Sequence, residues 1–88
     1  MFYVYILYSG LLDKYYVGMS SNPERRLLYH NIGKSGSKYA FTKRAQDWKI
    51  VYKRSFDSRE NALKYEKTIK KKKSRTFIQK LISDYEDS

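Results

Sequence analysis

The stretch Tyr15–His30, YYVGMSSNPERRLLYH, contains the sharpest change of pattern in the chain. It begins as an apolar, tyrosine-rich run that is typical of a strand, and a glycine interrupts that run. A helix start follows at once: either Ser21 and Glu24 form a capping box, or Asn22 caps the helix with the proline behind it in the first helical position. The stretch therefore predicts a strand, a tight connection and a helix that runs to about Asn31.

The rest of the chain divides into similar elements. Residues 2–8 (FYVYILY) are all apolar or aromatic, so we expect a central strand that is covered on both faces and joined by a turn at 9–13 to a strand at 14–19. Beyond the first helix we expect a flexible basic loop at 33–37, a short helix over 38–46 and a strand over 47–56. A capping box at Asp57–Glu60 should begin a helix that runs to Lys72, and a last helix should follow over 74–85. The expected fold is α+β, with a small three-stranded antiparallel sheet and helices packed around it in the order β-β-α-(α)-β-α-α, as one domain over residues 1–88.

Two periodic patterns predict which faces of these elements are buried. Trp48, Ile50 and Tyr52 alternate with two lysines and a valine, so one face of the third strand should be mostly wet. In the last helix the apolar residues recur at helical spacing and should face the sheet. These helix residues are Phe77, Ile78, Leu81 and Ile82.

Composition limits the compartment and the partners. The chain has 88 residues, a formal net charge of +10 and no cysteine. The lack of cysteine excludes disulfides, thiolate chemistry and cysteine-ligated zinc. There is no signal-peptide pattern and no apolar run near the roughly 18 residues that span a bilayer, so we expect a soluble cytoplasmic protein that does not enter a membrane. The positive charge makes a polyanion, and first of all nucleic acid, the expected partner.

Glu66 interrupts an otherwise apolar row on the second long helix. Ala62, Tyr65 and Ile69 fall at i, i+3 and i+7, and Glu66 falls at i+4 of the same row. A carboxylate on a core-facing row costs desolvation free energy unless it finds a partner. Two interpretations stay open: Glu66 pairs with Lys70 one turn later, or it points inward to a metal or a catalytic group.

Residues near the opening stretch are candidates for a polar site. Arg26 and His30 lie four residues apart, and so on one face of the first helix, although a solvated surface would also explain them. Tyr5 and Tyr16 lie within the hairpin strands, where core packing alone would account for both. Gly18 shares a face with Tyr16, and a glycine there would leave space for a ligand near the tyrosine hydroxyl.

Two basic segments suit contact with a nucleic-acid backbone. One is a run of four lysines followed by an arginine, whose charges fan around a helix, so that some contact phosphate and the rest are solvated. The other interleaves its charges with Tyr39 and Phe41, which suits base stacking. The residues expected to contact nucleic acid are Lys34, Lys38, Lys43, Arg44, Lys70, Lys71, Lys73 and Arg75.

Taken in order, these motifs resemble the GIY-YIG nuclease domain. The matching segments are Tyr3–Tyr5, Tyr16–Gly18, Asn22–Arg26 and Arg59–Glu66. The resemblance covers residues from about 2 to 82. It is strongest to the small stand-alone bacterial members of the family, which are relatives of the UvrC-type excision nuclease domain. The first motif begins with tyrosine where the family name has glycine.

This resemblance implies an endonuclease that hydrolyses phosphodiester bonds in DNA with one divalent cation, Mg²⁺ or Mn²⁺, in repair or processing of DNA structures. Glu66 would be the metal ligand, and Arg26 would face the phosphate. Tyr5 and Tyr16 match the tyrosines of the two named motifs, and His30 matches a position that is histidine or tyrosine in the family. Any of these last three residues could handle the proton.

Two other functions stay open. One is a non-catalytic, basic nucleic-acid-binding module on the same scaffold. The other is an interaction protein that docks a partner through its tyrosine-rich sheet. Full-size members of the family use attached domains to choose substrates, so a protein partner could supply specificity here, and RNA remains an alternative to DNA.

Overall fold

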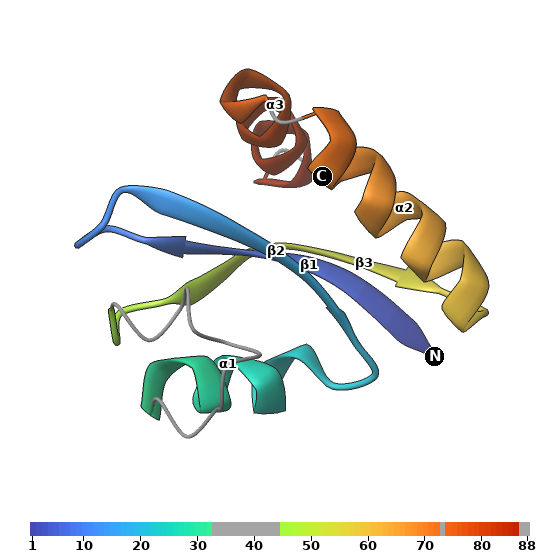
Figure 1. Ribbon diagram of the computed structural model, residues 1–88, viewed down its shortest axis with the longest axis horizontal. Helices are drawn as coiled ribbons and strands as arrows, with labels where there is room; N and C mark the ends of the chain where they lie inside the picture. The colour runs from blue at the N-terminus through green and yellow to red at the C-terminus, as the bar shows by residue number, and fades with distance from the viewer. Residues whose placement is uncertain (33–44, 73, 87–88) are drawn as a thin grey trace.

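The computed structural model describes residues 1–32, 45–72 and 74–86, which form a three-stranded antiparallel sheet and three helices (Figure 1). The elements are β1 (Phe2–Ser9), β2 (Lys14–Ser20), α1 (Pro23–Ile32), β3 (Lys49–Phe56), α2 (Arg59–Lys72) and α3 (Arg75–Glu86). The predicted α+β class and the order of these elements are confirmed. The predicted basic loop and nearly all of the short helix over 38–46 lie outside the described residues, and the last two residues of that span are not helical. Within the described ranges, no helix is both long and apolar enough to cross a membrane.

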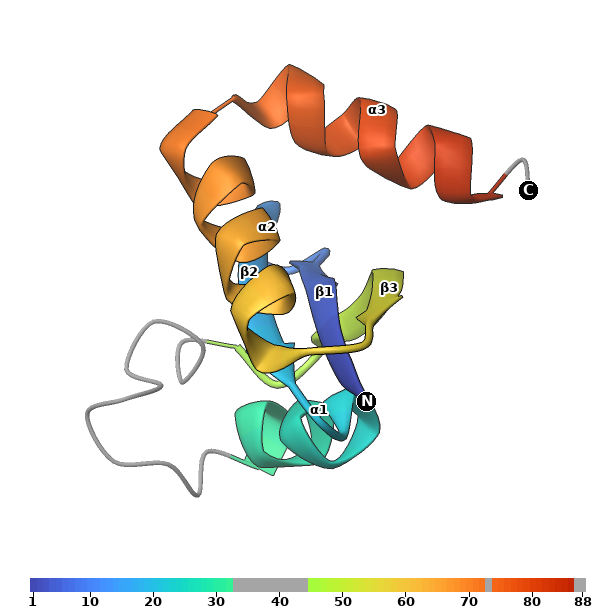
Figure 2. The ribbon, with the colours of Figure 1, turned by 90° about the vertical axis from the view of Figure 1, so that its right-hand side faces the viewer.

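The sheet has the strand order β2-β1-β3, and both pairs are antiparallel. Helix α1 lies on one face, while α2 and α3 lie on the other (Figures 1 and 2). The middle of β1 is almost inaccessible to solvent, because Val4, Tyr5, Ile6 and Leu7 are at most 2% exposed. The prediction of a central strand that is covered on both faces is confirmed.

Each face of the sheet has its own apolar cluster, because successive residues of a strand point to opposite sides. The cluster beneath α2 consists of Val4, Ile6, Val17, Tyr52, Ala62 and Ile69. The cluster beneath α1 consists of Tyr5, Leu7, Ala45 and Trp48, with Leu27 of α1 packed on it. The predicted apolar face of α3 packs against the first cluster, as expected.

The side chains of strand β3 do not alternate regularly between the two faces of the sheet along its whole length. Two consecutive residues of β1 face Tyr52 and Ile50, so Val51 is an extra residue in the pairing and forms a bulge. Trp48 and Ile50 therefore pack in the cluster beneath α1, whereas Tyr52 packs in the cluster beneath α2. The simple alternation predicted for this strand is wrong, because one inserted residue reverses the side to which later side chains point.

Side-chain caps fix where α1 and α2 begin. Asn22 Oδ1 accepts a hydrogen bond from the backbone N–H of Arg25 at 3.2 Å, so the second of the two predicted alternatives holds. At α2, Ser58 Oγ accepts from the backbone N–H of Asn61 at 3.2 Å. The cap is thus Ser58 and not the predicted Asp57, because only the residue directly before the first turn reaches that amide. These caps set the rotation of each helix, and so determine which side chains reach the edge of the sheet.

The turn between β1 and β2 is tied to the start of α3. Asp13 has a φ of 52°, a left-handed conformation that aspartate tolerates better than most residues. Its Oδ1 accepts from the Tyr8 hydroxyl at 2.7 Å and from Arg75 Nη2 at 2.6 Å, while Arg75 Nη1 donates to its carbonyl oxygen at 3.0 Å. The Arg75 guanidinium also lies 5.1 Å from the centre of the Tyr15 ring. The hairpin is thereby held against the C-terminal helix.

Candidate active site

A cleft of about 210 Å³ lies at the free edge of β2. Its lining comes from β1, β2, α1 and α2 and consists of Tyr5, Tyr16, Gly18, Met19, Arg26, Glu66 and Lys70. Helices α1 and α2 pack on opposite faces of the sheet (Figure 2), and both contribute side chains to the lining of the cleft. The structure thus brings together four of the predicted catalytic residues, Tyr5, Tyr16, Arg26 and Glu66.

Tyr5 and Gly18 form the floor of this first cleft. They are partners across the β1–β2 ladder, and a Cβ on Gly18 would lie 2.6 Å from both the Cζ and the hydroxyl oxygen of Tyr5. It would also lie 3.1 Å from the ring of Tyr16. The glycine therefore permits a close approach, which is a common reason for glycine inside a strand. The end of the Tyr5 ring fills the space that a Cβ on Gly18 would take, while Gly18 and Tyr16 both line the cleft, so the expectation that a ligand binds beside them stays a prediction.

The two tyrosines share one electrostatic environment. Burial raises the pKa of Tyr5 well above its ordinary range, and the neighbouring Tyr16 and Glu66 raise it further. The positive charge of Arg26 lowers the pKa of Tyr5 and so opposes these effects. Burial also raises the pKa of Tyr16, with a further rise from the Glu66 charge and an opposing effect from Arg26. Both phenols are protonated at neutral pH in this arrangement, so each can donate a hydrogen bond into the cleft.

Glu66 pairs with Lys70, as the first interpretation of its position predicts, and it also lines the first cleft, while its role toward a metal stays a prediction. Its side chain is only 14% exposed and lines the first cleft, and its Oε2 lies 3.7 Å from Lys70 Nζ. The desolvation cost of this carboxylate is offset by Lys70 and by Arg26, which lines the same cleft. The pair with Lys70 is long and Lys70 is half exposed, so the ion pair does not fix either side chain strongly.

The remaining predicted site residues are placed less completely. His30 lies in α1 one turn beyond Arg26, and its side chain falls outside the described part of the structure. Lys70 lines the cleft, Lys71 is exposed on α2, and Arg75 is bound to Asp13 on the hairpin turn. The other basic residues predicted to contact nucleic acid lie outside the described residues; they are Lys34, Lys38, Lys43, Arg44 and Lys73.

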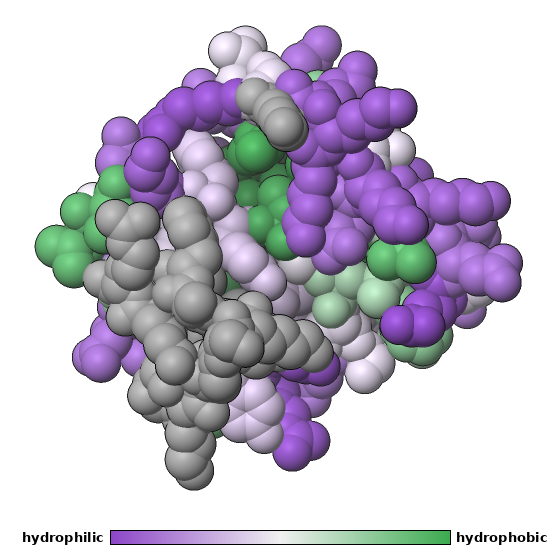
Figure 3. Space-filling view, viewed as in Figure 1, coloured by the Kyte–Doolittle hydropathy of each residue, from purple (hydrophilic) through white to green (hydrophobic). Residues whose placement is uncertain are grey.

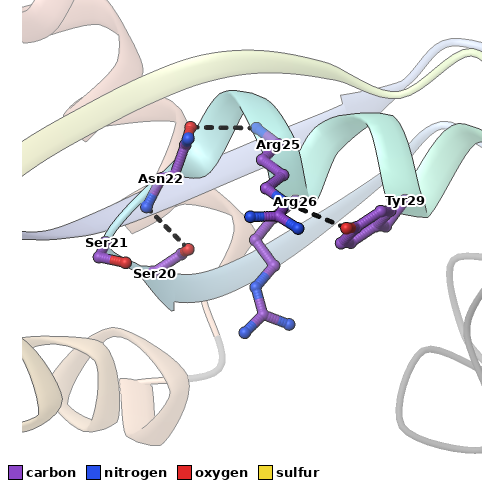
Figure 4. A pocket seen from close by; sticks show the side chains of 6 residues that line it. All are labelled: Ser20, Ser21, Asn22, Arg25, Arg26 and Tyr29. Carbon is purple, nitrogen blue, oxygen red and sulfur yellow. Dashed lines mark hydrogen bonds between the residues drawn. The ribbon is translucent and has the colours of Figure 1, made fainter.

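A second cleft, of about 290 Å³, adjoins the first and shares Arg26 with it (Figure 4). Its lining consists of Ser20, Ser21, Asn22, Arg25, Arg26 and Tyr29. Arg25 Nε donates to the Tyr29 hydroxyl at 3.0 Å, and the Arg25 guanidinium carbon lies 5.6 Å from the centre of the Tyr29 ring. Arg25 and Tyr29 were not among the predicted site residues, although their i, i+4 spacing on α1 is a signal that the sequence contains.

The first cleft contains one carboxylate that a hard divalent cation could bind. The described residues contain no group of three or more His, Cys, Asp or Glu side chains that could enclose an ion. Glu66 contributes a carboxylate to the cleft, beside the hydroxyls of Tyr5 and Tyr16. Mg²⁺ is typically held by one or two carboxylates, with water and substrate phosphate oxygens completing its coordination. One carboxylate in an open cleft fits such an ion.

Comparison with known proteins agrees with this geometry. Residues 1–81 match the family model of the GIY-YIG catalytic domain. A UPF0213 protein of Syntrophus aciditrophicus is 46% identical over 70 residues, which cover 78% of this chain and 76% of that protein. A UPF0213 protein of Streptococcus pneumoniae is 37% identical over 73 residues, which cover 83% of this chain and 70% of that protein. No solved structure gave a significant match. The family match over most of the chain, together with the fold and the ordered motifs, shows that the chain belongs to the GIY-YIG family.

Proposed function

We propose that the protein is a divalent-metal-dependent endonuclease that hydrolyses phosphodiester bonds in DNA. The observation that supports this most strongly is the convergence of Tyr5, Tyr16, Arg26 and Glu66 on one cleft in a chain of the GIY-YIG family. These residues come from four different elements, so packing within a single element does not explain their meeting.

The charge of the protein supports a polyanionic substrate. A formal net charge of +10 attracts nucleic acid at long range. On the face shown in Figure 3, hydrophilic side chains cover the region of α2. The lysines of that helix include Lys70, which reaches the first cleft, and Lys71, which is exposed beside it. A strand bound along this helix would meet positive charge before it reached the cleft.

Arg26 would bind the scissile phosphate. A guanidinium stays charged at all relevant pH values and presents its donors in a planar fork that matches two phosphate oxygens. Its position between the tyrosine floor and Glu66 would let it stabilise the negative charge that develops on the phosphate during hydrolysis. Lys70 would add a second cation on the α2 side of the cleft, since its pair with Glu66 is long.

Glu66 would hold the cation, either Mg²⁺ or Mn²⁺. When bound, such an ion would polarise the phosphate, stabilise the leaving oxygen and offset the Glu66 charge that helps raise the pKa of Tyr16. Glu66 is suited to this role because its side chain is largely covered by its neighbours and yet lines the cleft.

The hydrolysis itself requires a water oxygen to attack the phosphorus, the bond to the leaving oxygen to break, and a base to accept the proton of the water. Tyr5 is the weakest of the candidate bases, since it is 2% exposed and burial raises its pKa strongly. It is better suited to donate a hydrogen bond. Tyr16 is less buried than Tyr5, and imidazole is the side chain best suited to proton transfer near neutral pH, so we assign the proton to Tyr16 or His30.

A cleavage assay tests the proposed function. Supercoiled plasmid, linear duplex, branched duplex and RNA substrates would be incubated with the protein and Mg²⁺, Mn²⁺ or a chelator. Nicking that requires a divalent cation is the expected result, and a preference for branched duplexes would support a role in processing DNA structures. Tight, salt-sensitive binding that ignores the metal, without cleavage of any substrate, would favour the non-catalytic binding module instead.

A further inference from the structure

We propose that the second cleft binds the phosphate of a neighbouring nucleotide in the strand whose scissile phosphate occupies the first cleft. This inference rests on the proposed function, because it requires a nucleic-acid substrate. The two clefts share Arg26, so anions bound in them would both lie near this arginine. Consecutive phosphates of one strand would supply such a pair of anions.

The lining of the second cleft is chemically suited to an anion. It contributes two guanidinium groups, two serine hydroxyls, one amide and one phenol, and no carboxylate belongs to the described lining. The acidic residue on the same turn of α1, Glu24, is directed elsewhere, since its Oε2 lies 3.1 Å from Lys53 Nζ on β3. The described lining of the second cleft therefore carries positive charge and no carboxylate of its own.

Arg25 is held in a fixed position for this contact. Its Nε donates to the Tyr29 hydroxyl, which uses one of the five N–H donors of the guanidinium. Figure 4 shows the side chains of Arg25 and Arg26 extending from the same side of α1. An exposed arginine normally loses side-chain entropy when it binds a ligand, and a hydrogen bond that already orients it reduces this loss.

The remaining residues shape the wall of the cleft. Ser20 Oγ accepts from the backbone N–H of Asn22 at 3.0 Å, and Asn22 Oδ1 caps α1, so both side chains fix the turn that precedes the helix. Ser21 is exposed at the rim, where its hydroxyl can reach a bound phosphate. This set of groups suits the phosphate backbone more than a base edge, so the contact would be independent of sequence.

Binding measurements on an uncleaved complex test the proposal. Every variant would carry Glu66→Gln to prevent cleavage, and its affinity for a labelled DNA strand would be measured over a range of salt concentrations. We expect Arg25→Ala to weaken binding by about three- to tenfold and to reduce the salt dependence by the equivalent of about one phosphate contact. Arg59→Ala, which removes an exposed arginine at the start of α2, is the matched control and should change both quantities less.

A single neutral methylphosphonate, moved along the strand, locates the contact. At one position in the strand, the methylphosphonate should weaken binding to the protein that retains Arg25. At the same position it should not weaken binding to the Arg25→Ala protein any further. A 5′-phosphorylated strand and an unphosphorylated strand would be compared in parallel. An Arg25 effect that appears only with the terminal phosphate would overturn the assignment to an internal phosphate.

The hydroxyl of Tyr29 provides a second test that does not remove a charge. Tyr29→Phe should weaken binding less than Arg25→Ala does, and it should have no effect when Arg25 is already alanine. If Tyr29→Phe weakens binding equally whether residue 25 is arginine or alanine, Tyr29 does not act by positioning Arg25. If Arg25→Ala and Arg59→Ala have the same affinity for DNA and the same salt dependence, the second cleft is not a phosphate site. If the protein with intact Glu66 still cleaves DNA in that case, the proposed function is unaffected. These binding measurements test the second cleft even if the protein cleaves no substrate, because they do not depend on cleavage.

Discussion

The end of the Tyr5 ring lies over Gly18, its partner across the β1–β2 ladder, and occupies the position that a Cβ of residue 18 would take. Tyr5 is 2% exposed, so its ring is closely packed over the glycine. The glycine of the second motif and the tyrosine of the first motif are therefore coupled sterically. This contact sets where the Tyr5 hydroxyl lies relative to Arg26 and Glu66 in the first cleft.

Gly18→Ala should destabilise the fold by about 1–3 kcal/mol, because the new methyl group overpacks a position that the end of the Tyr5 ring already fills. Gly10→Ala is the matched control, since a Cβ there would meet Asp47 Oδ2 at an ordinary 3.7 Å. Urea denaturation of the three proteins checks this prediction. A Gly18→Ala protein as stable as the Gly10→Ala protein would show that the Tyr5 ring adapts easily.

Stability should fall at high pH through the buried tyrosines. Burial and the 2.8 Å hydrogen bond between the hydroxyls of Tyr52 and Tyr65 raise the pKa of Tyr52. An unfolded tyrosine loses its proton near pH 10, whereas folded Tyr52 keeps it to higher pH. The unfolded state thus binds fewer protons above about pH 10, so the free energy of unfolding is steady below that value and decreases above it. Tyr52→Phe should show a shallower decrease in urea titrations, and an identical slope in both proteins would contradict this origin.

Lys70 and Arg75 should differ in their effects on DNA binding. Lys70 lines the first cleft, whereas Arg75 is bound to Asp13 on the hairpin turn. We expect Lys70→Ala to weaken binding about three- to tenfold and to lower its salt dependence by about one contact. Arg75→Ala should instead lower thermal stability slightly and leave affinity closer to that of the unaltered protein. Anisotropy titrations beside thermal melts distinguish the two, and a larger loss of affinity from Arg75→Ala would assign that arginine to the DNA surface after all.

Arg26→Ala should reduce the rate of cleavage by roughly 100- to 1,000-fold, as expected when one charged donor to a developing anion is removed. Arg26→Lys should restore little, because an ammonium keeps the charge but not the planar pair of donors. Single-turnover cleavage rates at saturating DNA separate this effect from binding. Full activity in Arg26→Lys would show that charge alone is needed at this position.

The parts of the fold that could be predicted are those with strong local patterns. The uninterrupted apolar run of β1 predicted a central strand, and the two candidate caps, Ser21 and Asn22, predicted the start of α1 to within one residue. The bulge at Val51 could not be predicted, since nothing local indicates which residue of β3 lacks a partner on β1. The ion pair between Asp13 and Arg75 spans 62 residues, so it depends on how α3 packs and not on any sequence spacing.

The candidate site was predictable to a similar degree. Glu66 was identified because a carboxylate on an apolar helix row requires an explanation, and the structure places it in the first cleft. The close contact between Gly18 and Tyr5 was not predicted, because the sequence of one strand does not reveal which residue of the next strand faces it. Arg25 and Tyr29 were missed, although their spacing was visible, because their significance depends on the cleft that forms beside them.

The central claim is that Glu66 holds the catalytic cation, and the most direct measurement compares Glu66→Gln with Glu60→Gln in the cleavage assay. Both substitutions remove one carboxylate charge from α2, but Glu60 is exposed in the first turn and lies outside the cleft lining. We predict that Glu66→Gln lowers the cleavage rate at least about 100-fold with Mg²⁺ or Mn²⁺ while DNA binding is retained, and that Glu60→Gln changes neither. Cleavage by Glu66→Gln at the rate of the unaltered protein would contradict the account.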